Sequence, residues 1–264
     1  MKIAYENENV TLWHGDCREV LPTLPPWDVL VTDPPYPGLT GGHDRDFAGG
    51  VADRKTVTES VGNVWRLELN EWLPQAWAAT RIGGMVFCSY HTVADVRRVL
   101  PDAKANALGV WYKRNSPPTG KNLPRYTAEF VWMLSKAVGL AWDVLSTTVF
   151  DVPMPQAGCM ATERLLNADG TTLHPTQKPV ALMAQLLAAV RPGQTVCDPF
   201  AGTGTTLLAA AEAGLAAVGI ERDERFADVA RQRLERWHAQ GRLDFGTANA
   251  KGHAQGKPDS QKEV

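Results

Sequence analysis

Seven short apolar runs alternate with helical patterns along this chain, and this alternation limits the folds that it can adopt. The runs are Val10–His14, Trp27–Thr32, Gly84–Tyr90, Ala107–Tyr112, Glu129–Leu134, Gln194–Asp198 and Ala216–Glu221. Helical patterns cover Trp72–Arg81 and Val180–Val190. The run at Trp27–Thr32 is continuous enough to be buried on both faces. Buried strands that alternate with helices predict an α/β fold with a mainly parallel sheet.

Three stretches interrupt this alternation. Pro37–Gly62 is rich in Gly, Asp and Arg, Ser116–Pro124 contains Pro, Gly and Lys, and Asp151–Thr172 has no clear period. Loops of this length in a compact domain are usually functional or disordered. Residues 246–264 are polar and aperiodic, so we expect a disordered tail. A chain of 264 residues with 44% hydrophobic content can bury one substantial core, and residues 1–245 are predicted to form a single domain.

Composition argues against several classes of protein. The chain has no apolar run of about eighteen residues, which a membrane-spanning helix would need. The N-terminus turns polar at once and lacks the apolar centre of a signal peptide, so an intracellular, cytoplasmic location is expected. The four cysteines, Cys17, Cys88, Cys159 and Cys197, are scattered without a C-x-x-C pair. This spacing favours reduced thiols and gives no sign of a metal site.

Positive charge is concentrated in one part of a chain whose net charge is only −2. Between residues 97 and 125, Asp102 is the single acidic residue among the basic residues Arg97, Arg98, Lys104, Lys113, Arg114, Lys121 and Arg125. A local basic surface can hold a phosphate backbone even on a nearly neutral protein. The alternative is an ordinary solvated face, and the sequence leaves both open.

A glycine turn follows the sixth apolar run and precedes a helical pattern. It reads Asp198-Pro199-Phe200-Ala201-Gly202-Thr203-Gly204-Thr205-Thr206. Glycines let the backbone approach a ligand closely, and the helix N-terminus offers free N–H groups. The turn lacks the Gly-Lys-Ser/Thr of a Walker loop and the third glycine of a dinucleotide fingerprint. A purely structural turn is the alternative.

The next apolar run ends at Glu221, about twenty residues after the glycines, which is the spacing that one intervening helix requires. A carboxylate at this position can accept hydrogen bonds from both hydroxyls of a ribose. The alternative is a surface glutamate at the start of the charged run 221–225.

The run at Trp27–Thr32 leads directly into Asp33-Pro34-Pro35-Tyr36. The two prolines remove two backbone donors and stiffen the turn, so a carboxylate, the Pro34 carbonyl and an aromatic ring stand at the carboxyl end of a strand. That edge of an α/β sheet is where ligands bind. Two acceptors can bind both hydrogens of an exocyclic amine and direct its lone pair, while Tyr36 stacks on the ring. A simple proline turn is the alternative.

These motifs resemble those of the DNA amino-methyltransferases, the N6-adenine and N4-cytosine enzymes. D-P-P-Y precedes F-x-G-x-G in this chain, an order that is similar to the permuted β group of that family. A third match is His174-Pro175-Thr176-Gln177-Lys178-Pro179, directly before the helical pattern at 180–190. The resemblance implies a Rossmann-like S-adenosylmethionine-dependent methyltransferase fold. Its sheet has seven mainly parallel strands, one of them antiparallel, with helices on both faces, and the first strand lies beside the last two.

The resemblance also assigns roles to residues. Asp33, Pro34, Pro35 and Tyr36 would be catalytic. The cofactor would contact Asp16 near its adenine, Thr176 and Lys178 at its carboxylate, the turn residues Asp198, Pro199, Phe200, Ala201, Gly202, Thr203, Gly204 and Thr205, and Glu221 and Arg222. Asp16 has an alternative role as a helix cap. The implied organisation is a catalytic half at 10–136, a target-recognition segment at 151–172 and a cofactor half at 173–240, with no metal.

The expected activity is direct transfer of a methyl group from S-adenosylmethionine to adenine N6 in DNA, with base flipping, as in restriction-modification. Relatives that act on cytosine N4 more often carry serine at the position of Asp33, which favours adenine. The alternatives are N4-cytosine methylation, methylation of RNA or of a protein amide, and a silent relative that only binds DNA. Because the segment at 151–172 is short, we expect a partner subunit or a homodimer to contribute to target recognition.

Overall fold

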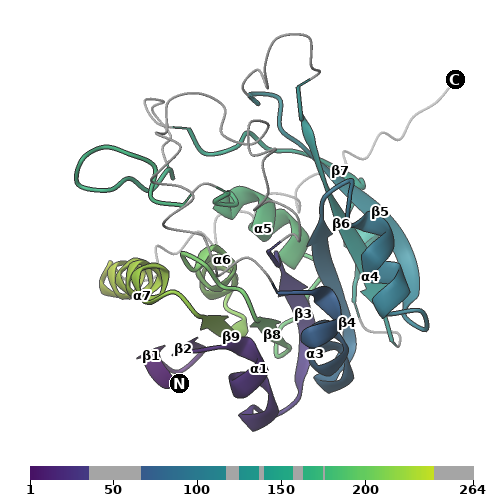
Figure 1. The fold of residues 1–264 in the computed structure, drawn as a ribbon, viewed down its shortest axis with the longest axis horizontal. Coiled ribbons are helices and arrows are strands. Elements are labelled where there is room, and N and C mark those ends of the chain that lie inside the picture. The colour runs from purple at the N-terminus through teal and green to yellow at the C-terminus, as the bar shows by residue number, and fades with distance from the viewer. Residues whose placement is uncertain (36–66, 117–124, 137–139, 157–162, 175, 241–264) are drawn as a thin grey trace, which may run out of the picture.

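The fold is a single mixed sheet with helices on both faces (Figure 1). The computed structural model describes residues 1–35, 67–116, 125–136, 140–156, 163–174 and 176–240. The strands are β1 (Lys2–Glu6), β2 (Val10–His14), β3 (Trp27–Thr32), β4 (Thr80–Cys88), β5 (Lys104–Tyr112), β6 (Ala128–Ser135), β7 (Val149–Asp151), β8 (Thr195–Asp198) and β9 (Ala216–Glu221). Their order across the sheet is β1-β2-β9-β8-β3-β4-β6-β5-β7.

The helices divide between two apolar clusters. Helices α5 (Val180–Leu187), α6 (Thr205–Glu212) and α7 (Glu224–Ala239) share one cluster with one face of the sheet. Helices α1 (Cys17–Val20), α3 (Leu73–Ala79) and α4 (Val93–Val99) share the other cluster. Short 3-10 turns lie at η1 (Leu21–Thr23), η3 (Leu69–Glu71) and η4 (Trp142–Val144). The expected α/β class is therefore confirmed.

The described residues contain nine strands rather than the expected seven. All seven predicted strands are present, and β6 is antiparallel to both of its neighbours. The additional strands are edge strands: β1 pairs antiparallel with β2, and β7 pairs parallel with β5. Their burial is incomplete, because only Phe150 of β7 and no residue of β1 is buried. Edge strands of this kind lack the continuous apolar run that identified the central strands.

Several boundaries differ from those expected; for example, α5 ends at Leu187 rather than Val190, and β4 covers Thr80–Cys88 rather than Gly84–Tyr90. The helix predicted at Trp72–Arg81 ends at Ala79, and Thr80 and Arg81 begin β4. The buried Thr80 hydroxyl donates to the Ala76 carbonyl at 2.8 Å and accepts from the Trp27 indole at 2.9 Å, which fixes the change from helix to strand. Asp151, expected to begin a loop, ends β7.

Several predictions concern residues outside the described ranges. The loop at Pro37–Gly62, the tail at 246–264, most of Ser116–Pro124 and Cys159 are among them. The division into halves and the single-domain boundary at residue 245 also stay predictions. Within the described ranges, none of the helices has the length and hydropathy to cross a bilayer.

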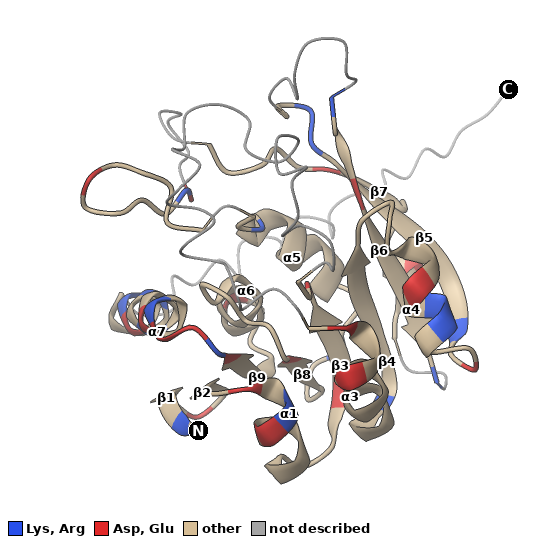
Figure 2. Ribbon diagram, viewed as in Figure 1, with Lys and Arg blue, Asp and Glu red and all other residues tan. Residues whose placement is uncertain are grey.

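The basic residues between 97 and 125 that the structure describes do not all lie on a free surface. Lys113 is buried, and Arg97 donates to the carbonyls of Leu100 and Ala103 at the end of α4. Arg98 is paired with Asp95. Figure 2 shows basic and acidic segments side by side on α4 and α7. Acidic partners thus pair with Arg98, Lys113 and Arg114, and Lys121 lies outside the described residues.

The connections place a crevice between β8 and β3. The parallel strands β2, β9, β8, β3 and β4 end at one edge of the sheet. Helix α6, which joins β8 to β9, lies on one face, whereas α3, which precedes β4, lies on the other. A sheet opens for ligands where its crossovers change face in this way. The expected neighbourhood of β2, β9 and β8 is confirmed.

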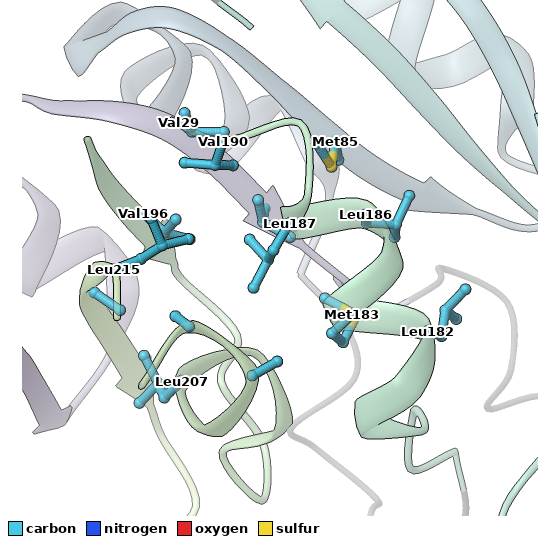
Figure 3. Packing of buried hydrophobic residues seen from close by; sticks show 14 of the residues in the cluster. Val29, Met85, Leu182, Met183, Leu186, Leu187, Val190, Val196, Leu207 and Leu215 are labelled. Atoms are coloured by element: carbon cyan, nitrogen blue, oxygen red, sulfur yellow. The ribbon is translucent and has the colours of Figure 1, made fainter. Parts of the chain in front are cut away.

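Side chains from α5, α6 and β8 form a shared apolar core beneath this crevice. Figure 3 shows Met183 and Leu187 of α5 beside Val196 of β8 and Leu207 of α6. Burial of one such side chain contributes about 1.5–3 kcal/mol. At Gly219 of β9, a Cβ atom would lie 2.6 Å from the Leu207 side chain. The absence of a side chain there lets α6 pack closely on the sheet and sets the position of the glycine turn before it.

Candidate active site

A pocket at this edge of the sheet gathers the motifs that the sequence singled out. Asp33, Pro34 and Pro35 line it together with the predicted cofactor residues Asp16, Thr176, Lys178, Asp198, Pro199, Phe200, Ala201, Gly202, Thr203, Thr205, Glu221 and Arg222. Gly204 does not line the pocket, and Tyr36 lies outside the described residues. Segments separated by more than a hundred residues thus meet at one cavity.

The glycine turn is held by its backbone. Gly202 and Gly204 both have positive φ, at 52° and 80°. Gly204 is the N-cap residue of α6, and a Cβ atom there would lie 2.9 Å from that of Ala230 in α7. The structure thus gives Gly204 a packing role. Gly202 instead faces the pocket, where the His174 ring is its neighbour.

Glu221 at the end of β9 fastens this turn. Its carboxylate accepts from the Gly202 N–H at 2.8 Å and from the Asp223 N–H at 2.7 Å. Burial raises the pKa of Glu221 to about 7. Each carboxylate oxygen has a second lone pair, so both keep acceptor capacity toward the pocket.

Asp16 combines the two roles that the sequence left open. It caps α1 by accepting from the Arg18 N–H at 3.0 Å, and it also lines the pocket. Hydrogen bonds from the Arg18 side chain hold the pKa of Asp16 below its ordinary value. Arg222 approaches the same carboxylate at 3.8 Å and is about half exposed.

Asp198, at the end of β8, is a buried carboxyl. It accepts from the Phe200 N–H at 3.0 Å, and burial raises its pKa to about 6. Phe200 packs edge-on against Trp72, with 4.7 Å between ring centroids. Asp198 therefore fixes the backbone where the turn begins.

The H-P-T-Q-K-P segment forms part of the pocket wall. The His174 ring lies 4.6 Å from the ring of Phe226, and burial lowers the pKa of His174 to about 3, so the imidazole is neutral. The buried Gln177 amide accepts from the Leu165 N–H at 3.0 Å. Glu163 accepts from the N–H of Val180 at the start of α5 at 2.7 Å. These bonds tie residues 163–165 to the helix that follows the motif.

A chain of alternating charges lies behind Asp33. The Lys178 ammonium contacts the Asp33 carboxylate and lies 3.1 Å from Oε2 of Glu129. The Lys113 ammonium lies 2.9 Å from Oε1 of Glu129. We call Asp33, Lys178, Glu129 and Lys113 the charge tetrad. Two lysines and two carboxylates give it no net charge, which is how buried ions avoid an uncompensated desolvation cost.

Neighbouring charges set the protonation of the tetrad. Burial alone would lower the pKa of Lys178, but attraction by Asp33 and Glu129 raises it above its ordinary value. Burial opposes ionisation of Glu129, but Lys178 and Lys113 together hold its pKa below the usual range. Lys178 and Glu129 are thus charged near neutral pH.

The sequence did not reveal Glu129 or the burial of Lys113. Lys113 belongs to the basic run for which the sequence left two surface roles open, but its side chain is only 8% exposed and is paired with Glu129. The signal lay in the period of the strands. Lys113 comes two residues after the buried Trp111, and Glu129 comes two residues before the buried Val131. Side chains two positions apart along extended chain share a face, which places both lysine and glutamate inward.

The pocket suits the expected cofactor. The Glu221 and Asp16 carboxylates offer acceptors for hydroxyl and amino groups, the glycine turn permits close backbone approach, and the rings of Phe200 and Phe226 supply apolar surface. Among the described residues, no cluster of three or more His, Cys, Asp or Glu side chains has a metal-binding arrangement.

Comparisons with known proteins identify relatives of this chain. A family model of N6 and N4 methyltransferases, described as DNA methylase, matches residues 27–232. The Type II methyltransferase M.HinfI of Haemophilus influenzae is 28% identical, over 85% of this chain and 68% of that protein. The structure of the M1.HpyAVI–SAM complex has a TM-score of 0.58, with 22% identity, 85% of this chain covered and 99% of that chain. The cytosine-N4-specific PvuII DNA methyltransferase has a TM-score of 0.63, with 19% identity and 88% of each chain covered.

The match covers most of the chain and includes both the segment of Asp33 and the glycine turn. The two solved structures agree in fold with the sheet described above. The chain belongs to the N6/N4 family of DNA methyltransferases, which use S-adenosylmethionine as methyl donor.

Proposed function

We propose that this protein transfers a methyl group to N6 of adenine in DNA. The observation that carries the proposal is the Asp33 carboxylate, which is held by Lys178 at the pocket that also contains the glycine turn and Glu221. An aspartate at position 33 favours adenine, because family members that act on cytosine more often have serine there. The Type II relative supports a role in restriction-modification.

Asp33 and the Pro34 carbonyl would act on the target amine. An exocyclic amine is a poor nucleophile, because its lone pair is delocalised into the ring. Two acceptors that bind its two hydrogens favour a pyramidal nitrogen, whose lone pair then points away from the acceptors. S-adenosylmethionine supplies an electrophilic methyl group on a sulfonium. Asp33 also stabilises the positive charge that develops on nitrogen, an electrostatic contribution that needs an ionised carboxylate beforehand.

The proton requires no strong base at the outset. The amine becomes acidic only after it has gained the methyl group, so Asp33 can accept a proton late or pass it to solvent. Lys178 keeps the carboxylate ionised until then, because protonating Asp33 would leave a buried ammonium with one counter-ion fewer.

The remaining pocket residues would hold the cofactor. Glu221 would accept from the ribose hydroxyls, Asp16 from the adenine side, and Thr176 would contact the methionine end. A base within a duplex cannot reach such a pocket, so flipping of the target nucleotide is part of the proposal. Tyr36 would stack on the flipped base. Homodimer formation remains a prediction.

The second candidate is N4-cytosine methylation, favoured by the fold of the PvuII enzyme. Duplex DNA treated with the protein and labelled S-adenosylmethionine, then digested to nucleosides, distinguishes the two. We expect labelled N6-methyladenine. Labelled N4-methylcytosine alone would overturn the adenine assignment, and absence of label from DNA would overturn the proposal as a whole. Asp33→Ala is the control that must abolish transfer.

A further inference from the structure

Lys178 is already engaged on the side of the pocket where Asp33 lies. Its ammonium contacts Asp33 and lies 3.1 Å from Glu129, and its side chain is only 7% exposed. The rings of Phe87 and Trp111 lie 5.4 Å and 5.8 Å from the nitrogen. Two carboxylates and two rings therefore define where this ammonium lies, in contrast to the expectation that it binds the cofactor carboxylate.

Asp33 contacts a cation from elsewhere in the chain. A carboxylate at the end of a strand commonly accepts from the next backbone N–H groups, as Asp198 does from Phe200. The two residues after Asp33 are Pro34 and Pro35, which have no N–H to donate. The Lys178 ammonium donates to the Asp33 carboxylate from a segment 145 residues away.

Glu129 stands between the two lysines of the tetrad. Oε1 accepts from the Lys113 ammonium at 2.9 Å. Oε2 is buried and lies 3.1 Å from the Lys178 ammonium. Without this charge, Lys178 would lose one of the two carboxylates that define its position. Lys178 would then be displaced, and Asp33 with it.

We propose that Glu129, supported by Lys113, is a positioning residue that holds Lys178 against Asp33 and so orients the carboxylate that binds the target amine. Lys178 accordingly serves the part of the site that contains Asp33 and is not the main ligand of the cofactor carboxylate. This inference rests on the proposed function in one respect, namely that Asp33 contacts the amine.

A double-mutant cycle tests the coupling between Glu129 and Lys178. The variants are Glu129→Gln, Lys178→Met and the pair, with Glu235→Gln as a matched control on the exposed face of α7. Single-turnover transfer of labelled methyl to duplex DNA is measured beside the Kd for S-adenosylhomocysteine. We expect Glu129→Gln to lower the rate on the order of 10²-fold, as displacement of a catalytic group by about 1 Å can. The Kd should stay at the wild-type value.

The double variant, Glu129→Gln with Lys178→Met, distinguishes a positioning role of Glu129 from a general structural role. If Glu129 acts through Lys178, the double variant is no slower than Lys178→Met alone, because coupled residues are not additive. Multiplied losses would overturn the inference. So would a wild-type rate in Glu129→Gln, or a Kd that rises in Lys178→Met while the rate at saturating cofactor is unchanged.

A second variant keeps the test possible if Glu129→Gln does not fold. Lys113→Met with Glu129→Gln removes one charge of each sign and leaves the Lys178–Asp33 pair. We expect this variant to keep the fold, by its melting temperature, and to show the same loss of rate. A folded variant with full activity would contradict the inference. Because label is counted on either base, a cytosine product leaves this test intact, whereas a wild-type enzyme that labels no DNA refutes the proposed function itself.

Discussion

The pocket has two halves that are built in different ways. The cofactor half contains Asp198, Gly202 and Glu221, and the acceptor half contains Asp33 and Lys178. In the cofactor half, Glu221 holds Gly202 and Asp223, and Asp198 holds Phe200, so carboxylates bind backbone N–H groups nearby in sequence. In the acceptor half, Asp33 is held by Lys178, a side chain 145 residues away. The first half is a local backbone structure and the second is a tertiary charge cluster. Substitutions should therefore affect cofactor binding and methyl transfer separately.

The largest expected effect is in the acceptor half. Asp33→Ala removes the carboxylate that binds the amine, and we expect single-turnover methyl transfer to fall by roughly 10³-fold, the upper range for loss of a preorganised charge-stabilising group. The Kd for S-adenosylhomocysteine, measured by calorimetry, should change little. A large rise in that Kd would show that the two halves are not separable.

The corresponding change in the cofactor half is Glu221→Ala. It removes a charged acceptor and releases the N–H groups of Gly202 and Asp223. Loss of hydrogen bonds to a charged group corresponds to about 1.5–3 kcal/mol, or roughly 10- to 100-fold in Kd for the cofactor. The transfer rate at saturating cofactor should stay near that of wild type. A rate loss as large as that of Asp33→Ala would break the comparison.

The same difference decides which parts of the site could be predicted from the sequence. D-P-P-Y and F-x-G-x-G are each a continuous stretch of sequence, so the residues that they bring to the pocket could be predicted from the motifs alone. Glu221 could be predicted from its spacing of one helix after the glycines. The pairing of Lys178 with Asp33 and Glu129 depends on how α5, β3 and β6 pack, which no local pattern encodes. Lys113 is an example, because it lies in a run of basic residues and yet its side chain is buried. The edge strand β1 was missed because its residues are too exposed to produce an apolar run.

A smaller effect should appear in the pH dependence of stability. Burial raises the pKa of Glu221 from 4.5 to about 7. A carboxyl with a raised pKa in the folded state favours folding below its unfolded pKa, and that contribution is lost as pH rises through about 7. Glutamine cannot ionise, so Glu221→Gln should not lose this contribution. Relative to wild type, the free energy of unfolding of the variant should therefore rise by about 1–3 kcal/mol between roughly pH 4.5 and pH 8. Urea denaturation at several pH values measures this difference, and a constant difference would contradict the assigned burial.

The smallest effect is expected outside both halves. Arg98 is paired with Asp95 on α4, so Arg98→Ala should leave DNA affinity and its salt dependence unchanged. A true phosphate contact would instead reduce the slope of log K against log salt by about 0.9. Fluorescence anisotropy with a labelled duplex at several salt concentrations measures the slope. A reduction would restore the basic segment at 97–125 as a DNA contact.

The most direct test is a crystal structure of the protein with S-adenosylhomocysteine and a duplex that contains its target site. An extruded adenine whose amino nitrogen lies about 3 Å from the Asp33 carboxylate, with Lys178 still on Asp33 and Glu129, is the predicted result. An amino group bound elsewhere, or a Lys178 ammonium turned to the carboxylate of the cofactor product, would contradict the account.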